Sequence, residues 1–131
     1  MNFRNDYQSP LKLNKLEIIE ASFKNDAQEE SLELGLSANR EINELGNNQY
    51  EILLSVFVAD KDQKLSVMVK SRGIFETEDA TKGLIERNAI AIMFPYMRSY
   101  ISLLTTQPSM APIVIPAINI VSLVESFEKN D

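Results

Sequence analysis

Apolar and polar residues alternate along one stretch of the chain, from position 32 to position 39. One set of alternate positions is apolar and the other is largely polar: Leu32, Leu34, Leu36 and Ala38 against Glu33, Ser37 and Asn39. Alternation with a period of two residues is typical of a β-strand that buries one face and exposes the other. We therefore predict a strand that starts at Leu32. The sequence Gly46-Asn47-Asn48 after it predicts a turn.

Three further segments are predicted to be strands, at 11–23, 50–59 and 65–75. Segment 50–59 is apolar on both faces, which is typical of a central strand that is covered on both sides. The charged residues 60–64 predict a hairpin connection between the last two segments. In the first segment the apolar phase shifts at Leu16 and again at Ile19, which predicts a bulge or a strong twist. Together the four strands predict an antiparallel meander.

After position 76 the spacing of apolar residues changes to that of helices. Thr77 is predicted to cap a helix whose first turn carries Glu78 and Asp79, because negative charge is favoured at a helix N-terminus. Pro95 disfavours the helical conformation of the residue before it. We therefore predict a break there, followed by a second helix over 97–105.

Prolines also determine the conformation that we expect after the second helix. Pro108, Pro112 and Pro116 favour extended backbone that cannot contribute fully to a sheet ladder. Asn119 is then predicted to cap a short C-terminal helix. The predicted fold class is α+β, a four-stranded antiparallel sheet packed with two to three helices.

A chain of 131 residues is expected to form one domain, over 1–131, with a core that needs no metal or disulfide. We expect residues 1–10 to be a flexible N-terminus and residues 128–131 to be a short tail. Two or three short helices are too few to cover both faces of the sheet. We therefore expect another copy of the chain to cover the remaining apolar face, in a homodimer or homotetramer.

Composition narrows the classes of function. The chain contains neither cysteine nor histidine, which excludes thiolate nucleophiles, imidazole bases and the usual zinc ligands. Its net charge of −6 argues against nucleic-acid binding, which requires a basic patch. The motifs GxxxxGK[ST], GxGxxG and GxSxG are absent. We expect a protein that is not an enzyme and that uses no cofactor or metal.

The thirty residues from 91 to 120 are strongly apolar and carry a single charge, Arg98. A membrane-spanning helix needs about 20 continuous apolar residues. Prolines and interleaved serines and threonines interrupt this segment, so we expect no insertion into a membrane. The polar N-terminus lacks the apolar run of a signal peptide, which predicts a cytoplasmic protein. Arg98 is expected to pair with a carboxylate at a subunit contact or to lie on the solvated face.

The chain contains the short motifs RGIF at 72–75, MFPYMR at 93–98, PSMAPIVIP at 108–116 and PAIN at 116–119. Together these motifs resemble those of the SecB family of protein-export chaperones. MFPYMR at 93–98 resembles the family's LFPYAR segment, and PSMAPIVIP at 108–116 resembles its proline-rich crossing loop. PAIN at 116–119 resembles the P-x-N-F that leads into the family's last helix, and RGIF at 72–75 is similar to its GGIF. The order and spacing of these motifs, from about Leu13 to Phe127, make the resemblance specific.

The resemblance implies a four-stranded sheet with two helices, assembled as a dimer of dimers, that holds unfolded preproteins in apolar grooves without nucleotide. Methionine and aromatic side chains suit such a surface because they repack around varied partners. The residues that we expect to bind clients are apolar and lie at a strand end, around a proline, in the crossing loop and in the last helix: Ile74, Phe75, Phe94, Tyr96, Met110, Ile113, Ile115, Ile118 and Leu123.

The resemblance also bears on partners. Glu20 stands where family members carry an acidic residue that contacts the SecA motor. Lys24 and Met68 stand where further acidic residues are expected, which weakens the predicted coupling to SecA. The expected client is either a set of unfolded preproteins or one dedicated partner, such as the antitoxin of a toxin–antitoxin pair.

Two functions of other classes fit the same apolar segment. It could line the closed pocket of a small-ligand-binding domain, or it could form the interface of a purely structural oligomer. A holdase suppresses the aggregation of an unrelated unfolded protein. A ligand-binding protein is stabilised by its ligand and does not suppress aggregation, whereas a structural oligomer does neither.

Overall fold

The computed structural model of the chain describes residues 11–27, 32–78 and 82–129. Four strands and two helices follow one another in the order β1 (Lys12–Asn25), β2 (Gly35–Gly46), β3 (Gln49–Ala59), β4 (Leu65–Glu76), α1 (Lys82–Leu104) and α2 (Ile120–Lys129). The predicted α+β fold class, an antiparallel sheet with helices, is confirmed. The predicted flexible N-terminus, residues 1–10, lies outside the described residues. The first two residues of the predicted tail are helical, because α2 continues to Lys129.

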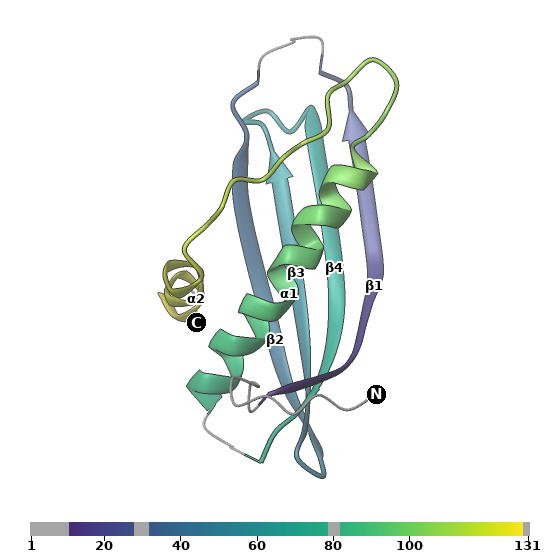
Figure 1. Cartoon of the computed structure of the whole chain (residues 1–131). Helices are drawn as coiled ribbons and strands as arrows, with labels where there is room; N and C mark the ends of the chain where they lie inside the picture. The colour runs from purple at the N-terminus through teal and green to yellow at the C-terminus, as the bar shows by residue number, and fades with distance from the viewer. Residues whose placement is uncertain (1–10, 28–31, 79–81, 130–131) are drawn as a thin grey trace.

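All four strands form one antiparallel sheet, with the spatial order β1-β4-β3-β2. The predicted meander is therefore correct for β2, β3 and β4 but not for β1, which pairs with β4 on the far side of the sheet (Figure 1). Periodicity reports which face of a strand is buried and carries no information on its neighbours. For that reason the pattern alone did not distinguish the two possible places of β1.

Two local predictions about the strands are confirmed. The pairing of β1 with β4 shifts register between Leu13 and Lys15 and again between Ile18 and Glu20, which are the expected irregularities. Asn47 and Asn48 connect β2 to β3 with φ angles of 55° and 62°. Asparagine adopts this left-handed conformation more readily than other residues with a side chain, which explains the predicted turn.

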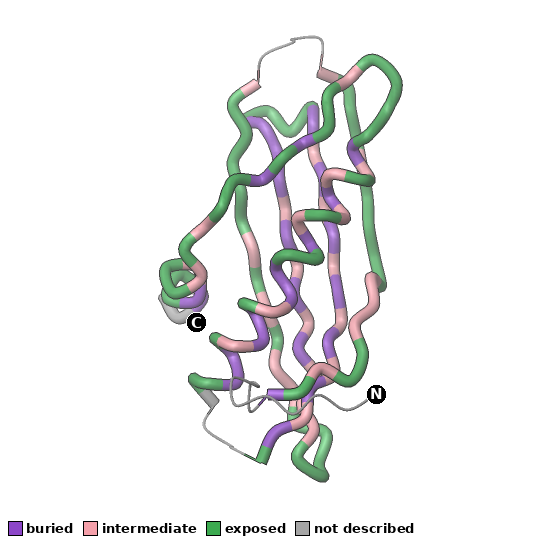
Figure 2. The backbone as a smooth tube through the Cα atoms, viewed as in Figure 1, coloured by how far each residue is buried: buried purple, intermediate pink, exposed green. Residues whose placement is uncertain are grey.

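Helix α1 lies across one face of the sheet, the inner face, and contacts β3 and β4 (Figure 1). The inner-facing residues of β3, Ile52, Leu54 and Val56, are fully buried under it. On the opposite, outer face Leu53 and Phe57 are only half-buried. Figure 2 shows that buried positions concentrate in β3, β4 and α1, whereas β1 and β2 are mostly exposed or intermediate. The expectation that another copy of the chain covers part of the surface stays a prediction.

The predicted break at Pro95 is wrong, because α1 continues from Lys82 to Leu104 with this proline inside it. A proline in a helix interior costs about 3 kcal/mol through its missing N–H and its clash with the preceding turn. Met93, Phe94 and Met97 flank it and are at most 2% exposed. Burying each of these side chains contributes about 1.5–3 kcal/mol. Packing on the sheet therefore outweighs the local preference of the proline.

Of the two predicted helix caps, that of Thr77 stays a prediction, because residues 79–81, between Thr77 and the start of α1 at Lys82, lie outside the described residues. The backbone N–H of Thr77 donates to the carbonyl oxygen of Asn48 over 3.0 Å. Asp79, predicted for the first turn, lies outside the described residues. The Asn119 cap is confirmed, because its Oδ1 accepts a hydrogen bond from the N–H of Ser122 over 3.1 Å at the start of α2.

Candidate functional site

Residues 106–119 connect α1 to α2 and run across the inner side of the sheet from the β1 side to the β2 side (Figure 1). We call them the crossing segment. Within it the side chains of Ile113 and Ile115 are 8% and 4% exposed, whereas that of Val114 is 73% exposed. This alternation is that of an extended chain with one face on the core. The prolines therefore produce the extended backbone predicted from the sequence.

Polar side chains of α1, together with that of Thr105 directly after it, bind the backbone of the crossing segment. The Ile113 N–H donates to Thr105 Oγ1 over 2.8 Å, and Ser102 Oγ donates to the Ile113 carbonyl over 2.8 Å. Arg98 Nε donates to the Ile115 carbonyl over 3.1 Å. Because these three residues are spaced about one helical turn apart, they form a row along α1. They replace the ladder partners that an extended segment outside the sheet lacks.

The structure gives Arg98 a contact that the sequence did not predict, because its guanidinium donates to a backbone carbonyl of the same chain. The expected carboxylate at a subunit contact stays a prediction. Thr105 is fully buried, and its hydroxyl donates to the Ile101 carbonyl over 2.8 Å while it accepts from Ile113. This hydroxyl joins the last turn of α1 to the crossing segment.

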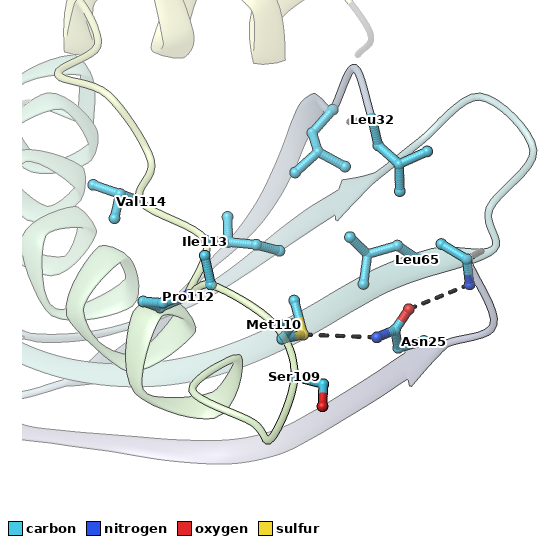
Figure 3. Close-up of a pocket in the computed structure, with 11 residues that line it drawn as sticks. Asn25, Leu32, Leu65, Ser109, Met110, Pro112, Ile113 and Val114 are labelled. Atoms are coloured by element: carbon cyan, nitrogen blue, oxygen red, sulfur yellow. Dashed lines mark hydrogen bonds between the residues drawn. The ribbon is translucent and has the colours of Figure 1, made fainter. Parts of the chain in front are cut away.

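A groove of about 630 Å³ lies between the crossing segment, the end of β1 and the chain that leads into β2 (Figure 3). We call it the crossing groove, and its lining residues are Asn25, Ala27, Leu32, Leu34, Leu65, Ser109, Met110, Ala111, Pro112, Ile113 and Val114. Asn25 connects two of its walls. Its Nδ2 donates to Met110 Sδ over 3.8 Å, and its Oδ1 accepts from the Ala27 N–H over 3.2 Å (Figure 3).

Asp60 organises the β3–β4 hairpin that presents Leu65 to the groove. Its Oδ1 accepts a hydrogen bond from the Leu65 N–H over 2.8 Å, and its own N–H donates to the Leu65 carbonyl over 3.2 Å. The bond from Leu65 holds the pKa of the Asp60 carboxyl below its ordinary value of 3.8, against the opposing effect of burial. The Asp26 N–H donates to the Lys64 carbonyl over 2.7 Å, which ties the end of β1 to the same hairpin.

Over the residues that the structure describes, the crossing groove is lined by no charged side chain and by mostly apolar ones, although polar atoms provide more than half of its exposed surface. Leucine, isoleucine, valine and methionine provide most of its side chains, and Asn25 and Ser109 provide the polar ones. Such a surface favours apolar side chains over charged ligands, because a charge would lose its hydration without a partner. The 630 Å³ volume accommodates a few large side chains and does not enclose them.

The structure brings only two of the residues predicted to bind clients into this groove, Met110 and Ile113. Phe75, Phe94 and Ile115 are at most 4% exposed and belong to the hydrophobic core. In this conformation they present no surface to a client. The sequence around an aromatic side chain at a strand end or beside a proline does not indicate whether that side chain faces the core or a groove. The pattern therefore did not distinguish core residues from groove residues.

Four predicted residues lie on other surfaces. Ile74 is on the outer face of β4, opposite Lys15 of β1. Ile118 and Leu123 are half-buried against the core at and near α2. Tyr96 is 55% exposed and lines a separate hollow of about 340 Å³ between α1 and β1. The predicted client-binding residues are therefore dispersed over several faces of the molecule.

The predicted motor contact, Glu20, lies on β1 directly opposite Lys70 of β4. On the same sheet Arg72 joins two acidic residues. Its Nη1 donates to Glu17 Oε1 over 3.1 Å, and its Nε lies 3.0 Å from Glu51 Oε2 in an ion pair without hydrogen-bond alignment. Partially exposed pairs of this kind contribute about 0–1 kcal/mol each. The role of Glu20 stays a prediction.

Sequence reasoning missed several lining residues, above all Leu34, Leu65 and Val114. Leu34 was recognised in the alternating stretch, and Val114 in the apolar run. Combining proline-enforced extension with a period of two would have placed Val114 opposite Ile113 and Ile115. Nothing in the sequence indicates that Leu65, far along the chain, faces the same groove.

Comparisons with known proteins bear on this architecture. Residues 5–130 match the protein family described as SecB, preprotein translocase subunit SecB. An uncharacterized protein of Methanocaldococcus jannaschii, MJ0357, is 25% identical over 112 residues, which cover 78% of this chain and 72% of that protein.

A solved structure has a similar fold. It is that of the Mycobacterium tuberculosis Rv1957 SecB-like chaperone in complex with a ChAD peptide from the Rv1956 HigA1 antitoxin. The TM-score is 0.68 at 10% sequence identity, over 82% of this chain and 90% of that chain. At this identity the similarity concerns the fold. Among the described residues, no helix is long and apolar enough to cross a membrane.

Proposed function

The chain belongs to the SecB family of preprotein translocase subunits, and from that premise we propose that it is a holdase that binds apolar segments of unfolded polypeptides in the crossing groove without nucleotide. The observation that carries this proposal is the open groove, whose lining side chains among the described residues are uncharged and mostly apolar. Unfolded clients expose scattered large apolar side chains on extended backbone. A groove that is open along its length admits such a chain without requiring its ends to enter.

Adaptable walls support the same role. Met110 lies in one wall, and methionine repacks around different partners at low cost. That wall is chain outside the sheet, secured by single hydrogen bonds from α1 at Ser102, Thr105 and Arg98. We propose that capture competes kinetically with client folding and aggregation in the cytoplasm, and that no chemical step takes part.

The client is proposed to be either a set of unfolded preproteins or one dedicated partner. The similar fold of Rv1957, solved with an antitoxin peptide, supports the second possibility. Affinity purification from the host, with bound proteins identified by mass spectrometry, separates the two. Many unrelated precursors would identify a general holdase. One small partner at fixed stoichiometry would identify a dedicated chaperone.

Aggregation of a chemically unfolded test protein, followed by light scattering, tests the holdase directly. The wild-type chain is expected to suppress aggregation at near-stoichiometric ratio. Leu34→Asp places a charge in the groove at a side chain that is 36% exposed, and we expect it to lose suppression. Leu45→Asp is the matched control, because Leu45 is 49% exposed at the other end of β2 and does not line the groove. Equal suppression by both variants would refute the groove assignment.

We also propose that the chain assembles into a homodimer or homotetramer. The hollow beside β1 is lined by Leu16, Glu17, Ile18, Tyr96, Ser99, Tyr100 and Leu103. Leu103 is 69% exposed and Tyr96 is 55% exposed, and both lie on α1 next to an edge strand. Large exposed apolar side chains that gather at a sheet edge favour burial against another copy.

A further inference from the structure

We propose that the crossing segment binds an extended client segment through the backbone of Val114, so that its N–H and C=O form a short β-bridge with the client. This inference rests on the proposed holdase function and specifies how the crossing groove recognises its ligand. It assigns to the main chain of one residue a role that the apolar lining cannot fill, namely binding of any extended polypeptide regardless of its side chains.

The hydrogen bonds of the neighbouring residues fix the direction of the Val114 backbone. Ile113 turns both its N–H and its carbonyl toward α1, and Ile115 turns its carbonyl the same way. In an extended chain successive residues direct their polar backbone groups to opposite sides. The N–H and carbonyl of Val114 therefore point away from α1.

Within the described residues, the edge of the segment at Val114 has no backbone partner. Neither its N–H nor its carbonyl forms a hydrogen bond with any part of the chain that the structure describes. Val114 also lines the crossing groove. Figure 3 shows the side chains of Ile113 and Val114 on opposite sides of the segment, as an extended conformation requires. The unpaired edge thus borders the space proposed to hold the client.

Because of two prolines, the N–H of Val114 is the single backbone hydrogen-bond donor on this edge between positions 112 and 116. Pro112 and Pro116 stand two residues before and after Val114, and so share its edge. Proline has no backbone N–H. A client strand can therefore form a local bridge but cannot extend it into a ladder, and two copies of the segment cannot pair over their length. Weak, sequence-independent and reversible pairing is what a holdase requires, and the apolar lining then selects clients with apolar side chains.

Substitutions at Val114 test the bridge, with reduced and carboxymethylated lactalbumin as a permanently unfolded probe. Val114→Pro removes the N–H and is compatible with the extended backbone on both sides. Val114→Ala keeps the N–H and removes the exposed side chain. We expect Val114→Pro to bind the probe about three- to tenfold more weakly than Val114→Ala, which is the loss of one hydrogen bond. Equal affinity of the two variants would overturn the bridge.

Amide hydrogen exchange of the wild-type chain provides a measurement that does not depend on the stability of a variant. Saturation with the probe is expected to slow exchange at the Val114 amide about tenfold or more. Unchanged exchange at Val114, in a complex whose groove side chains are shielded, would reject the bridge and leave the holdase in place. A wild-type chain that does not bind the probe at all would refute both proposals.

Discussion

Arg40 on β2 and Glu86 on α1 form an ion pair in which Nε lies 2.7 Å from Oε1, and both side chains are nearly buried, at 12% and 7% exposure. The ring of Phe127 on α2 lies over the guanidinium, with its centroid 5.2 Å from Cζ. One cationic side chain of an edge strand therefore contacts both helices. Because α2 follows the crossing segment directly, this cluster anchors the far end of the groove wall.

Breaking the Arg40–Glu86 pair from one side is expected to destabilise the fold strongly. Arg40→Ala leaves the Glu86 carboxylate buried without this partner, and such changes cost about 3–5 kcal/mol. Urea unfolding followed by circular dichroism measures the change. Lys24→Ala is the control, because the Lys24–Asp26 pair is 3.6 Å long and 60% and 70% exposed, and it should cost less than about 1 kcal/mol. Similar small decreases in the free energy of unfolding of both variants would contradict the structural role of Arg40.

Removing the Thr105 hydroxyl is expected to loosen the crossing segment. Thr105→Val keeps the shape of the side chain but leaves the buried Ile113 N–H without its acceptor, which costs about 1–3 kcal/mol. Thr106→Val is the matched control, since its hydroxyl donates to the Ser102 carbonyl at an exposed position. We expect the control to change the free energy of unfolding by about 0.5 kcal/mol or less. If the two valine variants unfold at the same urea concentration, the hydrogen bond from Ile113 to Thr105 does not contribute measurably to stability.

Gly73 permits the close approach of α1 to the sheet. A Cβ at this position would lie 2.7 Å from Phe75 Cε2 and 3.0 Å from Met93 Sδ. Gly73→Ala is therefore expected to destabilise the protein by about 1–3 kcal/mol. Gly83 in α1 has open space around it, so Gly83→Ala should instead stabilise by up to about 1 kcal/mol through helix propensity. Opposite shifts in melting temperature are the expected result, and a tolerated Gly73→Ala would show that Met93 and Phe75 readjust freely.

The lowered pKa of Asp60 predicts acid sensitivity. Its carboxylate is more stable in the folded chain than in the unfolded chain, so its contribution is complete above the ordinary pKa of 3.8. The contribution is lost as the pH falls through the lower pKa of the folded state. Between about pH 6 and pH 2, the free energy of unfolding should fall more steeply with decreasing pH in the wild type than in Asp60→Asn. Parallel pH profiles would mean that the Leu65 bond does not stabilise the charged form.

Assembly through the hollow beside β1 predicts a change of oligomeric state. Leu103→Glu places a charge where we propose that copies meet, and the lost burial of about 1.5–3 kcal/mol weakens association by about tenfold or more. Sedimentation velocity should detect a shift to smaller species, while Leu45→Glu leaves assembly unchanged. A wild-type chain that sediments as a monomer at micromolar concentration would refute the proposed oligomer.

Short-range patterns in the sequence determined a large part of the secondary structure of this protein. The strand at 50–59, the Asn47-Asn48 turn, the irregularities of β1 and the Asn119 cap all follow from neighbouring residues in the sequence. Each depends on a property of a few consecutive side chains, such as alternation, tolerance of positive φ or a capping amide. The likeness of the motifs to the SecB family also came from their order along the chain, and the family match over residues 5–130 confirms it.

Tertiary structure alone decided the rest. β1 lies beside β4, and α1 runs through Pro95, because packing on the whole sheet outweighs the preference of single residues. Arg98 binds the Ile115 carbonyl because α1 and the crossing segment are adjacent in space, which no local pattern reveals. Ile113, Val114 and Ile115 are equally apolar in the sequence, yet two are buried and one is exposed. Which apolar side chain faces a groove depends on residues far away in the chain, so only the folded molecule could distinguish them.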